Sequence, residues 1–373
     1  MLLPTELLVP IFAEASSIGS RTDISSKNLC LYDVSTGDSR PLLPAPLNLV
    51  AVCRRWRAIA LEMPELWTSF SISLDSKLLS APTTLERLRC YIERSGERGM
   101  TIRIHGWYNN YNHKLPEVAP LMTTLSSSAH RWKELDLVSP SFLQTWNHSA
   151  LSFSQLLDET VPYPNSTALQ PQATLHSLTI GEPPDLSPES QSLSNHLFSS
   201  LISLTVTPTL YLHHLWYGGI LSQCSATLAD LTIELRGVPD EGNFHRWQVL
   251  PALRSLTIIA KWRKGNPKEA LASIFNALVC PGLKRLEVRV ETELPLVTKR
   301  GQWPSVEAAE FLAIAGHAAG KDGEERCKGN EGPSGLEELI LVSAKITAQE
   351  LADLLKATPG LKKLVFDGQT TTK

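Results

Sequence analysis

The sequence predicts an α+β or α/β protein in which a small N-terminal helical domain is followed by an irregular solenoid, with a strand plus a helix or loop in each repeat. Short apolar patterns with helical spacing occupy the segment before Trp67, whereas later segments alternate strand-like and helix-like patterns. In addition, one apolar motif recurs at a nearly constant interval along the second half of the chain. A recurring strand cannot bury its own face, so stacked copies are expected to share one core.

The first helical pattern lies in the segment LPTELLVPIF. Pro4 can open a helix, because a proline in the first turn lacks only a donor that would be unpaired anyway. The helix then carries an apolar face formed by Leu7, Leu8, Ile11 and Phe12. Its register is interrupted by Pro10, which removes one backbone donor and can kink the helix.

The second helical pattern lies in LNLVAVCRRWRAIALEMPELW, and it predicts a single helix that ends before Pro64. Its apolar stripe has steps of three and four residues and consists of Leu49, Val52, Trp56, Ile59 and Ala60. A helix this short is marginal by itself, so Trp56 and Trp67 must be covered by other parts of the chain.

Three segments in order resemble the F-box: Leu-Pro-x-Glu-Leu-Leu-x-x-Ile-Phe, then Val-Cys-Arg-x-Trp, then Pro-x-Leu-Trp. The phrases YIERSGE and HRWKELDL extend the resemblance to about residue 140 and are similar to the F-box family expanded in mushroom-forming fungi. The resemblance implies that the N-terminal helices dock a Skp-type adaptor, and through it a cullin. Under this interpretation residues 1–75 form the F-box-like domain, with a predicted loop inserted at 16–46.

The adaptor-binding surface or its immediate support is expected to include Leu3, Pro4, Leu7, Leu8, Ile11, Leu49, Val52 and Trp56. For Leu8 and Trp56 an equally natural interpretation is that they form the internal core of the helical domain, since large buried aromatic residues usually anchor a core.

The recurring motif is Leu-x-x-Leu-x-apolar. Its copies start at Leu175, Leu201, Leu228, Leu253, Leu283, Leu336 and Leu361, with a further copy expected at Trp132. The spacing is about 25 to 30 residues, with one interval about twice as long. The motif resembles that of leucine-rich repeats but lacks their regular asparagine. Residues 76–140 are therefore assigned to a connecting segment with a first repeat, and 141–373 to a leucine-rich-repeat-like array with a mobile, glycine-rich insertion at 316–335.

Residues between the motif leucines are expected to face outward, because successive side chains of a strand alternate between its faces. This set is the candidate substrate-binding surface and comprises Thr179, Thr205, Thr232, Thr257, Arg285, Arg289, Ile340, Val342 and Val365. A local excess of basic residues between 252 and 300 would attract an acidic partner. The alternative for the threonines is that they are simply good strand formers on a solvated face.

Composition narrows the function classes. The chain has 373 residues, of which 42% are hydrophobic, and a formal net charge of −3, so neither nucleic acid nor a membrane is an expected partner. The six cysteines contain no Cys-x-x-Cys pair, and no spacing typical of catalytic, cofactor or metal sites occurs, so we expect no enzyme, no cofactor and no metal. With no signal peptide expected, the predicted location is cytoplasmic and/or nuclear.

Two function classes remain at this stage. In the first, the chain is the substrate-recognition subunit of an SCF-type (cullin-RING) E3 ubiquitin ligase, in which the F-box docks the adaptor and the repeats bind a substrate protein that the sequence does not identify. In the second, it is a non-enzymatic repeat scaffold or protein-binding module unrelated to ubiquitin, whose N-terminal helices only cap the array.

Overall fold

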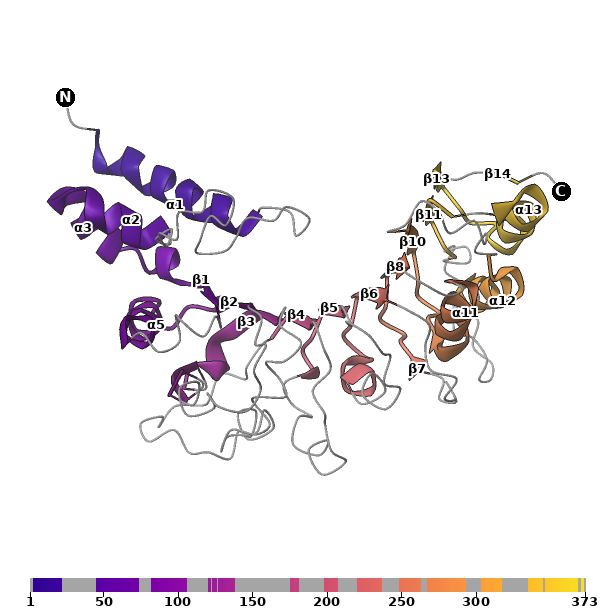
Figure 1. The fold of residues 1–373 in the computed structure, drawn as a ribbon, viewed down its shortest axis with the longest axis horizontal. Coiled ribbons are helices and arrows are strands. Elements are labelled where there is room, and N and C mark those ends of the chain that lie inside the picture. The colour runs from indigo at the N-terminus through magenta and orange to yellow at the C-terminus, as the bar shows by residue number, and fades with distance from the viewer. Residues whose placement is uncertain are drawn as a thin grey trace, which may run out of the picture. The chain divides into compact units, whose positions relative to one another are not determined.

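The computed structural model describes residues 3–21, 45–73, 82–105, 120–121, 123–125, 127–137, 175–180, 198–206, 220–236, 248–262, 267–292, 303–316, 335–344, 346–367 and 370–371. The chain divides into two compact units, Met1–Leu175 and His176–Lys373 (Figure 1). The sequence had placed a boundary near residue 140, which lies outside the described residues.

The first unit, called unit 1, contains α1 (Thr5–Arg21), α2 (Ala45–Val52), α3 (Arg54–Leu61), η1 (Pro64–Trp67), β1 (Ser69–Ser73), α5 (Pro82–Arg94), β2 (Met100–His105), η2 (Ala129–Arg131) and β3 (Trp132–Leu137). The second, called unit 2, contains β4 (Ser177–Ile180), β5 (Ser203–Val206), β6 (Asp230–Arg236), β7 (Gln248–Val249), β8 (Ser255–Trp262), α11 (Pro267–Ala277), β9 (Leu278–Val279), β10 (Arg285–Thr292), α12 (Ser305–Gly316), β11 (Glu338–Val342), β12 (Ile346–Thr347), α13 (Ala348–Ala357), β13 (Lys363–Asp367) and β14 (Thr370–Thr371).

The predicted fold class is wrong. The fold is α/β and is built on a ten-stranded sheet with the order β1-β2-β3-β4-β5-β6-β8-β10-β11-β13. The described neighbours pair in parallel. The sheet begins at Ser69, inside the segment assigned to the helical domain, so the chain is not a helical domain followed by a leucine-rich-repeat-like solenoid. Parallel strands need crossover connections of about a dozen residues or more. A motif with the observed spacing therefore fits a continuous α/β sheet as well as it fits a stack of repeats.

In unit 1, α1 packs against α2, α3 and η1. The single helix predicted after Leu47 is two helices, because the backbone of Cys53 is extended, with φ −157°, and interrupts it. The Cys53 Sγ accepts a hydrogen bond from the N–H of Trp56 at 3.4 Å and so caps α3. α1 extends to Arg21, beyond the start of the predicted loop at Ser16. The rest of that segment, 22–44, lies outside the described residues.

The first strand of unit 1 contacts α5, because the ring of Phe70 on β1 lies 5.4 Å from the ring of Tyr91. Ile102 pairs with Leu135 in the register of β2 and β3, and both side chains are buried. The buried indole N–H of Trp67 donates to the carbonyl of Ala60 at 2.9 Å. The ring of Tyr91 from α5 meets the Trp67 ring edge-on, with 5.2 Å between centroids. These contacts join the helices to the beginning of the sheet.

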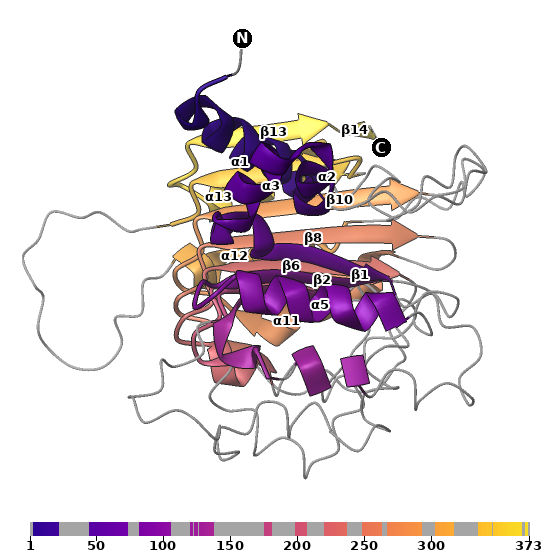
Figure 2. The same cartoon turned by 90° about the vertical axis from the view of Figure 1, so that its left-hand side faces the viewer.

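In unit 2, the motif copies from Leu175 onward lie on β4, β5, β6, β8, β10, β11 and β13, and these strands run side by side (Figure 2). The helices α11, α12 and α13 lie along one face of the sheet (Figure 1) and pack against one another in chain order. The core between them includes Phe275, whose ring lies 5.2 Å from Phe311 and 6.0 Å from Trp303. Thr347 caps α13 in a capping box with Glu350.

Candidate interaction surfaces

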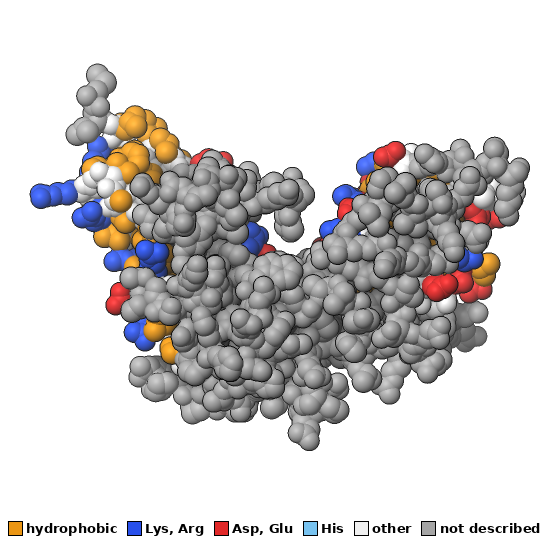
Figure 3. Space-filling view, in the orientation of Figure 1, with side chains coloured by type: hydrophobic (Ala, Val, Ile, Leu, Met, Phe, Trp, Pro, Cys, Tyr) orange, Lys and Arg blue, Asp and Glu red, His pale blue; other side chains and the backbone are white. Residues whose placement is uncertain are grey.

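Five large apolar side chains on or just before the N-terminal helices are exposed, among the residues there whose exposure the structure describes. We call them the N-terminal apolar patch: Leu3 (51% exposed), Leu7 (51%), Val9 (38%), Ile11 (48%) and Val52 (59%). Figure 3 shows hydrophobic side chains gathered on these helices. Leu3, Leu7 and Ile11 are four residues apart, so the last two form a stripe on α1 that Leu3 extends beyond the helix start. Scattered single apolar residues are normal on a surface, whereas a cluster of exposed apolar side chains is a candidate interaction surface.

The adjacent stripe of α1 is buried. Leu8 is 2% exposed and Phe12 is 0% exposed. The Phe12 ring lies 4.9 Å from the ring of Trp56, which is itself half-buried. Leu49, on α2, is also buried. The interpretation of Leu8 as core is therefore the one that the structure supports.

The predicted adaptor residues thus separate into two groups. The exposed group is Leu3, Pro4, Leu7, Ile11 and Val52, and the supporting group is Leu8, Leu49 and Trp56. The break at Cys53 changes the direction of the chain, and Val52 consequently lies in solvent although it belongs to the predicted apolar stripe. Sequence reasoning missed Val9, because it lies outside the Leu7, Leu8, Ile11 and Phe12 spacing.

Two arginines fix the helices beneath this patch. Arg55 donates from Nη2 to the hydroxyl of Thr5 at 3.1 Å, which ties α3 to the start of α1. Arg57 donates from Nε to the carbonyl of Val50 at 2.8 Å, which ties α3 to α2.

The second candidate surface is the sheet face of unit 2 that carries the predicted outward residues. Thr179, Thr205, Thr232 and Thr257 pair with one another in register across β4, β5, β6 and β8, and each is half-buried. The four threonines therefore form a column across these strands. The same column continues through Glu287, Ile340 and Val365.

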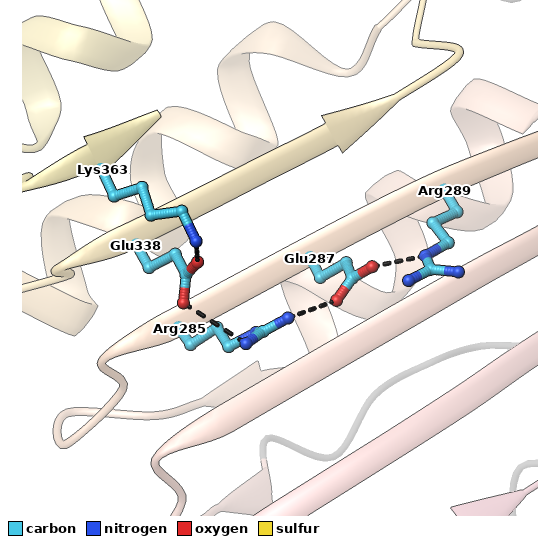
Figure 4. A network of polar contacts seen from close by, with 5 residues as sticks. All are labelled: Arg285, Glu287, Arg289, Glu338 and Lys363. Carbon is cyan, nitrogen blue, oxygen red and sulfur yellow. Dashed lines mark hydrogen bonds and ion pairs between the residues drawn. The ribbon is translucent and has the colours of Figure 1, made fainter. Parts of the chain in front are cut away.

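The two predicted basic residues on this face are held by one buried carboxylate. Arg285 donates to Glu287 at 2.9 Å, and Arg289 donates to its other oxygen (Figure 4). Glu287 is only 4% exposed. Burial raises the pKa of Glu287, but the hydrogen bonds from Arg285 and Arg289 outweigh it and hold the pKa below its usual value. Both guanidinium groups are therefore already paired within the sheet, which weakens the predicted attraction of an acidic partner to them.

A second set of charged side chains lies at neighbouring positions of β10, β11 and β13 and just before these strands. Glu338 lies between Arg285, at 3.4 Å, and Lys363, at 2.5 Å (Figure 4). Glu337 lies between Lys284, at 3.4 Å, and Lys362, at 2.9 Å. Each glutamate is thus shared by two cations.

The predicted apolar group on this face is less exposed than expected. Ile340 is 9% exposed and Val342 is half-buried, whereas Val365 on β13 is 37% exposed. Ile340 is flanked in register by Glu287 and Val365 on the neighbouring strands. The accessible part of this group therefore lies at β13.

Comparison with models of known protein families and with curated proteins gives no match. Within the described ranges, no helix combines the length and apolar character needed to cross a bilayer. The same ranges contain no group of three or more His, Cys, Asp or Glu side chains placed to hold a metal ion.

Proposed function

We propose that this chain is the substrate-recognition subunit of an SCF-type (cullin-RING) E3 ubiquitin ligase. In this function the N-terminal helices dock a Skp-type adaptor, and through it a cullin, while unit 2 holds a substrate protein. The chain itself carries out no covalent chemistry and needs no cofactor. It acts in the cytoplasm and/or the nucleus.

The observation that supports this proposal is the N-terminal apolar patch. Leu7 and Ile11 are about half exposed although the adjacent stripe, Leu8 and Phe12, is fully packed. Because the helix already has a complete inward face, the outward leucine and isoleucine contribute nothing to the described core. An exposed apolar surface of this kind is explained if a partner protein covers it. The position of the patch coincides with the segment that resembles the F-box.

The same observation distinguishes the proposal from its alternative. A scaffold whose N-terminal helices only cap the sheet would need a polar outer face for solubility. The exposed stripe of Leu3, Leu7 and Ile11 is instead apolar. This difference favours docking over capping.

The decisive experiment is co-expression of the full chain with a Skp-type adaptor, followed by affinity purification and gel filtration. The proposal expects a complex of defined stoichiometry that survives gel filtration. If the folded chain elutes without the adaptor at concentrations of about 10 μM, where specific complexes of standard size are formed, the proposed function is wrong.

A further inference from the structure

We propose that the outer edge of β13 binds an extended acidic and apolar segment of the substrate, which joins the sheet as an additional parallel strand. This inference rests on the proposed function, because it names the class of substrate segment that unit 2 holds. It concerns the edge of the sheet and not the threonine column described above. Strand addition to an exposed edge is an established mode of peptide recognition, in which the backbone supplies affinity and alternate side chains supply specificity.

The first observation is that the core is incomplete at β13. The second motif leucines of the preceding strands of unit 2 lie in one register column, and each is 0–1% exposed: Leu178, Leu204, Leu231, Leu256, Leu286 and Leu339. The next member of this column is Leu364, which pairs with Leu339 but is 38% exposed. Val365, on the other face of β13, is 37% exposed. On each face of β13, the apolar side chains are therefore covered on the side of β11 and open on the outer edge.

The second observation is that β13 presents unpaired backbone groups. The N–H of Lys363 donates to the carbonyl of Glu337 at 3.0 Å, and the carbonyl of Asp367 accepts from Ser343, so both residues direct their backbone groups towards β11. Backbone groups of alternate residues in a strand point to opposite sides. The N–H and C=O groups of Leu364 and Phe366 therefore point away from β11. In the part of the chain that the structure describes, no strand pairs with β13 on that side.

The third observation is the charge pattern, which specifies the occupant. Across β10, β11 and β13 the signs alternate in two adjacent rows: Arg285, Glu338 and Lys363 in one row, and Lys284, Glu337 and Lys362 in the other. Both rows end on a lysine at the edge, and the side chains of Lys362 and Lys363 are 72% and 62% exposed. These rows hold four cations and only two carboxylates. An incoming strand that continues the alternation has two consecutive acidic residues.

These features together define the sequence of the segment. In the register of the sheet, two acidic residues face Lys362 and Lys363, and the three residues after them face Leu364, Val365 and Phe366. Because both faces of β13 are apolar and partly open there, all three of these residues should be apolar. The pattern is acidic-acidic-apolar-apolar-apolar. The chain itself contains this pattern on the partner strand of β13, at Glu337–Leu341.

A synthetic peptide with the core sequence Glu-Glu-Leu-Ile-Leu, flanked by solubilising residues, tests the inference on the full chain without adaptor. Fluorescence anisotropy should show binding to the wild type. The double variant Lys362→Glu/Lys363→Glu should bind about tenfold more weakly, since two exposed ion pairs are converted to repulsions. It should instead prefer a matched Lys-Lys-Leu-Ile-Leu peptide. Because the variant places glutamates beside Glu337 and Glu338, its circular dichroism spectrum and thermal midpoint are compared with those of the wild type before binding is measured.

Backbone recognition is tested separately by N-methylation of the peptide. In the parallel register, the amide of the peptide isoleucine points at the carbonyl of Leu364, whereas the amide of the preceding leucine points away from β13. Methylating the isoleucine amide should weaken binding about tenfold, and methylating the leucine amide should not. Equal effects of the two methylations, or equal affinity for the acidic and basic peptides, would overturn the inference.

Two further results would also overturn it. One is slow hydrogen exchange at Leu364 and Phe366 in the free monomer, which would show that the chain covers its own edge. The other is a dimer in sedimentation that is lost in the lysine variant, which would show that a second copy occupies the edge. Adaptor capture by the full chain, which depends on unit 1, is measured in parallel. Failed peptide binding with intact capture refutes only the edge inference, whereas failed capture with intact peptide binding refutes the ligase function.

Discussion

The rings of Phe12 and Trp56 lie with centroids 4.9 Å apart and planes tilted by 60°, and this contact joins α1 to α3. Phe12 is completely buried, whereas Trp56 keeps part of its surface in solvent. This contact therefore distinguishes two apolar stripes on α1. The inward stripe of α1 holds the helices together, and the outward stripe, Leu7 and Ile11, stays about half exposed.

Replacing Phe12 with alanine is expected to destabilise the packing of α1 by about 3–5 kcal/mol, because it leaves a cavity against Trp56. Hydrogen exchange of the α1 and α3 amides should accelerate accordingly. The matched control is Val52→Ala, at an exposed position, which should change stability by about 0.5 kcal/mol or less. Similar exchange in both variants would show that the aromatic contact does not stabilise these helices.

Replacing Leu7 and Ile11 with aspartate is expected to abolish capture of a Skp-type adaptor, because both exposed side chains would place charges in an apolar contact. The substitution should leave the circular dichroism spectrum and the thermal midpoint unchanged, since neither residue contributes to the described core. Leu355→Asp is the matched control, because this leucine is 39% exposed on α13 of unit 2. Leu8 is unsuitable for this test, since its burial would confound binding with folding. If the folded double variant still captures the adaptor, the patch is not the docking surface.

Local signals made part of this structure predictable. The alternation of Leu178 and Ile180 with polar residues identified β4, and Thr347 with Glu350 identified the start of α13, because each signal is contained within a few residues. The fold class was not predictable in the same way. A recurring strand followed by a crossover has the same sequence pattern in a solenoid and in one continuous parallel sheet, and only the pairing of the strands decides between them.

The candidate surfaces were predicted in outline but not in detail. Helical spacing alone does not decide which of two apolar stripes on α1 faces inward, and it gave no sign of the break at Cys53. On the sheet, alternation correctly placed Arg285 and Arg289 on one face. It could not reveal that both are bound by Glu287, because that depends on side-chain geometry on a single strand.

The capping box of α13 gives a clean test of local stability. Thr347 accepts a hydrogen bond from the N–H of Glu350 at 3.2 Å, and the Glu350 carboxylate accepts one from the N–H of Thr347 at 2.8 Å. Thr347→Ala should lower the free energy of unfolding by about 1 kcal/mol, and Thr347→Ser should retain most of it. Urea denaturation of the two variants would measure this difference. Equal losses would indicate that the methyl group, and not the cap, is responsible.

The buried carboxylate of Glu287 should make the stability of unit 2 depend on pH in the acid range. Hydrogen bonds from Arg285 and Arg289 hold the pKa of Glu287 below its ordinary value despite burial, so the folded state binds fewer protons there than the unfolded state. The stabilisation is therefore present above the ordinary pKa of glutamate and is lost as the pH falls through the lowered value in the fold.

Glu287→Gln should remove this dependence. The variant should be less stable than the wild type near neutral pH, because two guanidinium groups lose their charged partner, and the two stability curves should converge as the pH falls through the lowered pKa of Glu287. Urea midpoints measured from about pH 7 to about pH 3 would test this expectation. Glu338→Gln is the matched control. The pKa of Glu338 is also lowered, chiefly by its hydrogen bond from Lys363. Solvent screens this more exposed pair, so its effect on stability should be smaller. Curves for wild type and Glu287→Gln that stay parallel throughout would mean that Glu287 does not couple protonation to folding.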